Sequence, residues 1–251
     1  MSSANPGSTQ FDRRQRPRLF SSSQKAHISV VVPVHDEEQN LLRLHARLST
    51  ALDRLRRTWE VVYVDDGSRD GSLRLLRGLA AADPRIVAVE LSGNHGQHTA
   101  VLAGFERCQG EVVITLDADL SNPPEEIGSL VDALEAGHDV ATGRPEARRG
   151  SLWKRLAQGA TDRLASRILR RDLTDFSSMM RAYRREVVVR MLRSRELGGH
   201  VPALGVTCAR CVAEVPVRQD PRLAGSPRTS LARLARLNRD LRLRAMEAEA
   251  A

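Results

Sequence analysis

The sequence predicts an α/β fold with a mainly parallel sheet, and two observations support that prediction. Short β-branched runs alternate with helical patterns between residues 28 and 143, which is typical of βαβ units. Acidic residues follow several of these runs, at the position where parallel sheets bind their ligands. The length of 251 residues is enough for one large domain or two small ones.

The predicted elements follow one another in a regular order. The longest apolar run, 28–34, is only of strand length, and a helical pattern follows it over 37–57. Further strand-like runs occur at 60–64, 86–91, 112–116 and 139–142. Helical patterns fill the intervals between them, at 70–81, 97–107 and 124–136. We therefore expect five strands, of which each of the first four is followed by a helix.

The second part of the chain differs in charge and in pattern. Residues 144–195 carry 15 basic residues against five acidic ones, whereas 28–143 carry ten arginines against 19 acidic residues. Apolar residues recur every four positions over 152–168 beside arginines, which fits a helix on an anionic membrane surface or one packed on the domain. A second Arg-bordered pattern predicts an amphipathic helix over 230–251, and residues 1–26 read as a disordered basic tail.

Composition excludes several classes of protein. With 41% hydrophobic and 28% charged residues the chain is not wholly disordered, and three cysteines are too few for a disulfide scaffold. No stretch approaches the roughly 18 apolar residues of a membrane span, and no signal-like segment follows Met1. The net charge of +8 is accompanied by only 3% aromatic residues, so platforms for stacking bases are scarce. We expect an intracellular protein, soluble or bound to a membrane surface, with no nucleic-acid partner.

Two carboxylates follow one of the predicted strands. Asp117 and Asp119 come directly after the run 112–116, and hard oxygen ligands at this spacing can hold Mg²⁺ or Mn²⁺. A single D-x-D pair is common and carries little information. Here, however, acidic motifs also follow two other strands, at 35–38 and at 65–68. The combination predicts a ligand or metal site at this edge of the sheet.

Four motifs resemble those of the family 2 inverting glycosyltransferases: Val-Pro-Val-His-Asp-Glu-Glu (32–38), Val-Asp-Asp-Gly-Ser (64–68), Asn-His-Gly-Gln-His (94–98) and Leu-Asp-Ala-Asp-Leu-Ser-Asn-Pro-Pro-Glu (116–125). Within that family the chain is most similar to polyprenyl-phosphate glycosyltransferases, of the dolichol-phosphate mannose synthase and undecaprenyl-phosphate 4-deoxy-4-formamido-L-arabinose transferase types. The segment 175–185 resembles the second type. The resemblance implies a GT-A fold, with a single Rossmann-like nucleotide-binding domain over 27–229. Its donor and metal half would be 27–143 and its basic acceptor half 144–229.

The same resemblance implies roles for individual residues. Asp117 and Asp119 would hold the metal, Mg²⁺ or Mn²⁺, and through it the diphosphate of the donor. Arg144 would assist departure of that group as a fixed cation, and Asp119, Arg144 and Asp175 form the expected catalytic set. Arg181 and Arg228 would contact the phosphate of the acceptor. The donor, for which the resemblance favours a UDP-sugar, would be bound by Pro33, Val34, Glu37, Asp66, Gln97 and Asp117.

The chain departs from the family pattern at three places. His35-Asp36-Glu37 replaces the usual Tyr-Asn-Glu, so a ring lying against the base would be an imidazole. Ser121 stands where family members usually have a glutamine that can touch the metal. Arg228 stands where the acceptor loop often has lysine, which keeps the charge and changes its geometry.

Two further groups could bind a metal. Cys208-x-x-Cys211 is half of a zinc pattern, but Cys108 is the only other cysteine, so partly buried thiols beside a strand are expected. His95 and His98 lie at the start of a predicted helix, and in the family this loop lies near the donor. A role at the helix entry is therefore favoured for them over metal binding.

The expected function is transfer of a sugar from a nucleotide-sugar to a polyprenyl phosphate, by an enzyme at the cytoplasmic face of an anionic membrane. The alternative is a soluble transferase that acts on a hydroxyl group, for which Asp175 would be the general base. A lipid phosphate needs little base catalysis because its second pKa is near 6. A third possibility, a non-catalytic binding module, is disfavoured by the intact acidic residues at the strand ends. The sequence leaves the sugar and the oligomeric state open.

Overall fold

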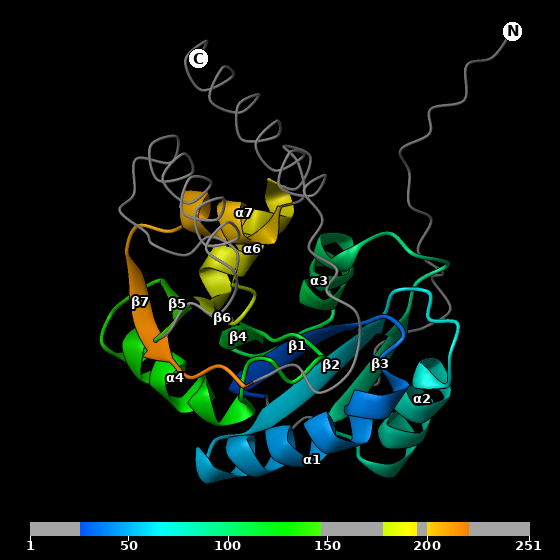
Figure 1. Ribbon diagram of the computed structural model, residues 1–251. Helices are drawn as coiled ribbons and strands as arrows, with labels where there is room; N and C mark the ends of the chain where they lie inside the picture. Colours follow the sequence, from blue (N-terminus) through cyan, green and yellow to red (C-terminus); the bar gives the residue numbers. More distant parts are fainter. Residues whose placement is uncertain (1–25, 147–177, 195–199, 221–251) are drawn as a thin grey trace, which may run out of the picture.

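The described residues form a seven-stranded sheet with helices on both faces (Figure 1). The computed structural model describes residues 26–146, 178–194 and 200–220. The strand order is β3-β2-β1-β4-β6-β5-β7, and within these ranges only β6 runs antiparallel to its neighbours. The strands are β1 (Ile28–Val34), β2 (Trp59–Asp65), β3 (Ile86–Glu90), β4 (Val112–Thr115), β5 (Val140–Pro145), β6 (Arg181–Arg184) and β7 (Val212–Val217).

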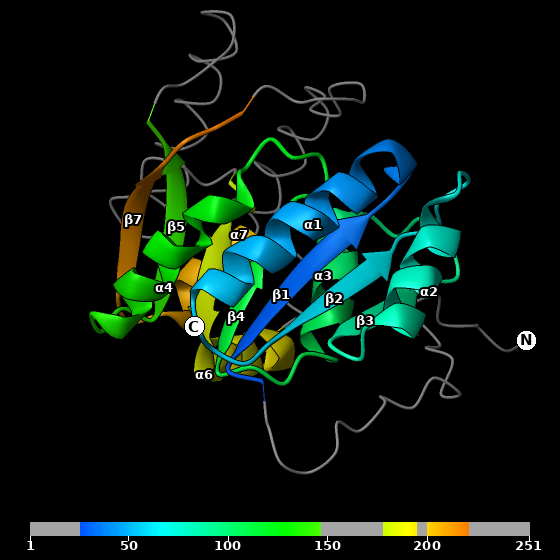
Figure 2. The same ribbon diagram turned by 90° about the horizontal axis from the view of Figure 1, so that it is seen from below.

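Two layers of helices cover the sheet, and the alternation of side chains along the strands builds a core under each layer. Val30 and Val32 of β1 belong to the core beneath α1 and α4, whereas Val31 belongs to the core beneath α3 and α6. Helices α1, α2 and α4 lie on one face, and α3, α6 and α7 lie on the other (Figures 1 and 2). The helices are α1 (Glu38–Arg54), α2 (Ser72–Ala82), α3 (Gln97–Phe105), η1 (Pro124–Glu126), α4 (Ile127–Glu135), α6 (Arg185–Arg193) and α7 (Val201–Cys208).

The predicted α/β fold with a mainly parallel sheet is confirmed, and the elements expected between 28 and 143 are present with ends shifted by a few residues. The expected tail (apart from Ala26), the pattern at 152–168 and the helix over 230–251 lie outside the described residues. In the described part of the chain, no helix is both long and apolar enough to cross a bilayer. Cys108 is buried, Cys208 half-buried and Cys211 exposed, and all three are free thiols.

The sheet has two strands beyond the five expected, β6 and β7, and the sequence of β6, Arg-Ala-Tyr-Arg, is unusually basic for an internal strand. The structure shows how the two arginines are accommodated. Arg181 is fully buried and its Nε donates to the carbonyl oxygen of Ser178 at 2.8 Å. Arg184 donates from Nε to the carbonyl oxygen of His138 at 2.9 Å and from Nη2 to that of Leu134. Both guanidinium groups therefore donate hydrogen bonds to backbone carbonyl oxygens inside the fold.

A histidine in α1 makes the stability of the protein depend on pH. Burial lowers the pKa of His45, whose Nδ1 lies 3.2 Å from the hydroxyl of the buried Tyr63. Since the folded-state pKa lies below the unfolded value of 6.5, the unfolded chain takes up the proton first as the pH falls. The stability contributed by neutral His45 is thus fully present above pH 6.5 and is lost as the pH falls through the folded pKa.

We expect His45→Gln to reduce this acid-side loss, because glutamine does not titrate. The measurement is the midpoint of urea unfolding at about pH 7.5 and about pH 5.5 for both proteins. The difference between the two midpoints should be smaller in the variant. An equal difference would show that His45 does not carry the linkage.

Candidate active site

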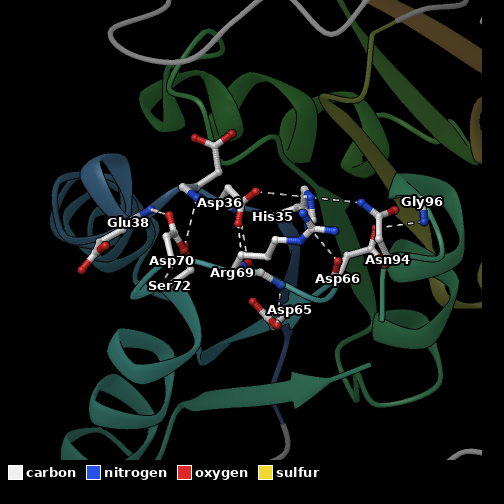
Figure 3. A network of polar contacts seen from close by, with 12 residues as sticks. His35, Asp36, Glu38, Asp65, Asp66, Arg69, Asp70, Ser72, Asn94 and Gly96 are labelled. Carbon is white, nitrogen blue, oxygen red and sulfur yellow. Dashed lines mark hydrogen bonds and ion pairs between the residues drawn. The ribbon is translucent and has the colours of Figure 1, made fainter. Parts of the chain in front are cut away.

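The carboxyl ends of β1, β2 and β4 bring the acidic motifs to one edge of the sheet. β1 pairs in parallel with β2 up to Val34 and Asp65, and on its other side it pairs with β4. The loops that follow these strands therefore lie side by side, together with the 94–97 loop before α3. Figure 3 shows the polar contacts among three of these four loops.

Side chains between β2 and the start of α2 bind the backbone amides that lead into α1. The amides of Asp36, Glu37 and Glu38 each donate to one of these side chains. Of these three amides only that of Glu38 lies within α1, and Glu37 is the residue that caps the helix. Figure 3 shows how closely the two segments are bonded. The acceptors are Ser68 Oγ at 3.0 Å, Ser72 Oγ at 3.0 Å and Asp70 Oδ2 at 3.1 Å, in the order of the three amides.

The same two loops are also bonded in the opposite direction. The amide of Arg69 donates to Oδ1 of Asp36 at 2.7 Å, and the amide of Gly71 donates to Oε2 of Glu38 at 2.9 Å. Glu37 is turned to its own helix, where its Oε2 accepts from Asn40 Nδ2 at 2.7 Å. Asp36 and Glu38 therefore fix the two segments to each other.

Asp66 holds the loop that precedes α3. Its carboxylate is almost fully buried, and it accepts from the amide of His95 at 2.7 Å and from that of Gly96 at 2.9 Å. Gly96 has a φ of 89°, which a residue with a Cβ rarely adopts. Asp66 thereby sets where α3 begins, and the side chain of Gln97, the first residue of α3, reaches Asp117 after β4.

His35 connects the same three loops. Its Nδ1 lies 2.8 Å from the carbonyl oxygen of Asp66, and a carbonyl can only accept, so Nδ1 carries the proton. Its Nε2 lies 3.0 Å from Nδ2 of Asn94, and the amide donates to it when the ring is neutral. Both ring nitrogens are engaged, which fixes the orientation of the imidazole.

The D-x-D carboxylates are held in different ways. Asp117 is half-buried and accepts from Nε2 of Gln97 at 2.5 Å. Asp119 is 5% exposed and accepts from the amide of Ser121 at 2.9 Å. Between Asp119 and Ser121, Leu120 has a φ of 60°, a conformation that costs an L-residue roughly 1–2 kcal/mol. Its buried side chain lies in the core beneath α1 and α4 and anchors this turn.

The donor set fits a divalent cation that is shared with a substrate. Among residues 26–146, 178–194 and 200–220, no group of three or more His, Cys, Asp or Glu side chains could enclose a metal ion. Asp117 and Asp119 offer two hard carboxylates. Mg²⁺ is commonly held by one or two carboxylates and completed by water and phosphate oxygens. The residues therefore fit Mg²⁺ or Mn²⁺ bound together with a diphosphate.

The comparison with protein families decides the classification. The family model described as "Glycosyl transferase family 2" matches residues 29–192. The chain belongs to glycosyl transferase family 2. The resemblance seen in the four motifs is thereby confirmed, and with it the expected class of glycosyltransferase.

Relatives of this family 2 member carry a more specific name. The chain is 42% identical over 217 residues to the undecaprenyl-phosphate 4-deoxy-4-formamido-L-arabinose transferase of Pectobacterium atrosepticum, covering 86% of this chain and 66% of the relative. It is 38% identical over 224 residues to the protein of that name from Salmonella choleraesuis, covering 89% and 68%. The chain thus spans about two thirds of the length of these relatives.

Solved structures confirm the GT-A fold of this glycosyltransferase. Glucosyl-3-phosphoglycerate synthase from Mycobacterium tuberculosis, in complex with Mn²⁺, UDP-glucose and phosphoglyceric acid, matches with a TM-score of 0.62. That match is 19% identical and covers 88% of this chain and 80% of the synthase. TarS from S. aureus, in complex with UDP-GlcNAc, matches with a TM-score of 0.54, at 17% identity over 86% of this chain and 65% of TarS.

The structure brings most of the expected donor-side residues of this family 2 enzyme together. Pro33 and Val34 are the last, buried residues of β1. Glu37, Asp66, Asp117 and Asp119 lie in loops around them, and Gln97 begins α3. Arg144 is exposed near the carboxyl end of β5, beyond β6. Arg181 in β6 has 0% exposure, and its role toward an acceptor phosphate stays a prediction. Asp175 and Arg228 lie outside the described residues, and their roles stay predictions.

Sequence reasoning missed the residues that hold the site together. It had no role for Ser68, Asp70 and Ser72, which bind the backbone amides of residues 36–38 where the chain enters α1. Ser and Asp before a helical pattern are a recognised signal for capping, but here they cap a neighbouring helix start, and spacing along one chain does not reveal that. His98 was expected at a helix entry. Its ring packs against that of His200, the residue before α7, with 4.5 Å between the ring centroids.

Proposed function

We propose that this glycosyltransferase moves a sugar from a UDP-sugar to a polyprenyl phosphate, with inversion and with help from a divalent metal, at a cytoplasmic membrane surface. The main support is the similarity to transferases named for undecaprenyl phosphate, which extends over most of this chain. The order of charge along the sequence agrees with it. An acidic half carries the metal-binding motif, and a basic half suits a phosphate acceptor and anionic lipids.

The chemistry of the proposed reaction fits the residues at the strand ends. A divalent metal, when bound, supplies charge stabilisation to the departing diphosphate. Asp117 and Asp119 are the side chains that would hold it, and Gln97 orients Asp117 through their 2.5 Å hydrogen bond. Support for a metal and for UDP comes from fold relatives crystallised with Mn²⁺ and UDP-sugars. Arg144 adds a fixed positive charge from β5 in the proposal.

The acceptor in this proposal needs no strong base. A polyprenyl phosphate has its second pKa near 6 and is largely ionised at neutral pH. Its oxygen can attack the sugar carbon without first losing a proton to the protein. A hydroxyl acceptor would instead require proton removal, a step that contributes about 10²- to 10⁴-fold in rate. The nature of the acceptor therefore separates the proposed function from its alternative.

The decisive experiment measures release of nucleoside diphosphate from a panel of nucleotide-sugars with three acceptor conditions: undecaprenyl phosphate, undecaprenol, and no lipid. The alcohol is the matched control, because it has the same chain and lacks only the phosphate. We expect release of UDP that requires the lipid phosphate, and faster turnover in anionic than in neutral vesicles at low salt. Equal release with undecaprenol, or equal release without lipid, would contradict the proposal.

A further inference from the structure

A short segment after β7 lies against the loop that carries the D-x-D motif. The amide of Asp220 donates to the carbonyl oxygen of Ser121 at 3.1 Å, and Nε2 of Gln219 donates to Oδ1 of Asn122 at 3.4 Å. Arg218 adds an ion pair, its Nε 2.7 Å from Oε1 of Glu126. In Figure 1 the orange chain leaving β7 runs beside the green loop that follows β4. Residues 218–220 are called the brace below.

Arg47 connects this brace to α1. Its Nε donates to Oε1 of Glu125 at 3.0 Å and its Nη2 donates to Oε2 at 2.8 Å, so the pair is bidentate. The same Nη2 lies 3.3 Å from Oδ2 of Asp220. Hydrogen bonding to Glu125 raises the pKa of Arg47, and the same contact lowers the pKa of Glu125. One guanidinium thus joins three segments that are 78 and 173 residues apart in the sequence.

The contacts reach Asp119 through a single residue. Ser121 donates its amide to Asp119 Oδ1 at 2.9 Å and accepts at its carbonyl from Asp220. The turn between them contains Leu120 with its positive φ of 60°, so it needs support from its surroundings to persist. The brace on one side and the buried Leu120 side chain on the other supply that support. The place of the Asp119 carboxylate therefore depends on where Asp220 is held.

We infer that Arg47 is a positioning residue for the D-x-D motif: it fixes Asp220 and Glu125, and through Ser121 it sets the Asp119 carboxylate where a metal–diphosphate complex is bound. The inference rests on the proposed function for the identity of the bound metal–diphosphate. The contacts of Arg47, Asp220 and Ser121 do not depend on that function. Isolated surface ion pairs contribute little, and Arg47 differs from them because it is three-quarters buried and bidentate. In this inference Arg47 acts only through its contacts with Glu125 and Asp220.

The first test needs no ligand. Hydrogen exchange, followed by mass spectrometry on peptides covering 116–126, reports whether the Ser121 amide and its neighbours stay protected. We expect exchange there to be about three- to tenfold faster in Arg47→Gln and in Asp220→Asn. Arg57→Gln is the matched control, because Arg57 makes a single ion pair of the same 2.8 Å with Glu135, away from this loop. Unchanged exchange in both variants would overturn the inference.

The second test measures binding of Mn²⁺ together with UDP by calorimetry. The dissociation constant should rise about three- to tenfold in Arg47→Gln, and less in Arg47→Lys, which keeps the charge without the fork. Adding Asp220→Asn to Arg47→Gln should weaken binding no further, since both act through one contact. Full additivity, or equal loss in Arg57→Gln, would contradict the inference. Failure of the wild-type protein to bind Mn²⁺ and UDP would instead count against the proposed function, while the exchange result would still decide the brace.

Discussion

Asp119→Ala is expected to lower kcat by at least about two orders of magnitude, a typical effect of removing one group that stabilises developing charge. Asp119 is 5% exposed and lies in the turn after β4, next to Asp117. The proposal gives it part of the metal–diphosphate complex, whose charge grows as the sugar leaves. Chelation of divalent cations should abolish turnover of the wild-type enzyme, and Mg²⁺ or Mn²⁺ should restore it. Steady-state release of UDP measures both effects.

Two variants separate charge from local structure in this prediction. Asp119→Asn keeps an oxygen that can accept from the Ser121 amide, so it should fold as the wild type does and still lose most of the activity. Asp132→Ala removes an exposed carboxylate from α4 and should leave the rate unchanged. Near-normal activity of Asp119→Ala that persists with chelator present would contradict the proposal that Asp119 binds a metal needed for turnover.

Gly67→Ala is expected to destabilise the fold by at least about 2 kcal/mol, because two costs act together. Gly67 has a φ of 69°, which disfavours any residue with a Cβ. An added Cβ would also lie 2.6 Å from the carbonyl carbon of Gly93 and 2.7 Å from the amide of Asn94. Both are backbone atoms, so the loop before α3 would have to move. That loop carries the amides bound by Asp66, and UDP binding should weaken as well.

The matched control is Gly78→Ala in α2. Gly78 is exposed, and a Cβ built there meets no atom within 4 Å. Alanine in a helix is favoured over glycine by about 1 kcal/mol, so this variant should be more stable than the wild type. Chemical denaturation of both variants measures the contrast. A Gly67→Ala protein as stable as Gly78→Ala would show that the tight approach between these loops is not required.

Periodicity was sufficient to predict the first four strands and helices, since each buried face there is made from residues close in sequence. Strand β6 was missed because arginines are not typical of a buried strand. They are accommodated here because backbone carbonyl oxygens accept their hydrogen bonds, and for Arg184 these carbonyls lie about fifty residues away in the chain. Pairing of β6 between β4 and β5 is a long-range event of this kind. No local signal distinguishes it from a basic loop.

In the candidate site, too, some residues could be predicted from the sequence and some contacts could not. Asp117 and Asp119 could be predicted from their place after a strand, and the structure gathers them with Gln97 and Asp66. The role of Arg181 at an acceptor phosphate was implied by the family resemblance and stays a prediction, and the structure shows that its side chain is fully buried. The support given by Arg47 had no sequence signal, because its partners are far along the chain. Residues with side chains suited to bind a ligand are thus easier to predict than the contacts that orient those side chains.

The strand order also constrains how the chain can fold as it is synthesised. β1 to β4 pair among themselves, so residues 28–115 can assemble into a parallel sheet as soon as they leave the ribosome. β5 must wait, because both of its neighbours, β6 and β7, are made after it. Until β6 arrives, β4 is an open edge, and the D-x-D residues stand at its end. The nascent chain therefore passes through a stage in which the strand that presents the D-x-D carboxylates is an unpaired edge of the sheet.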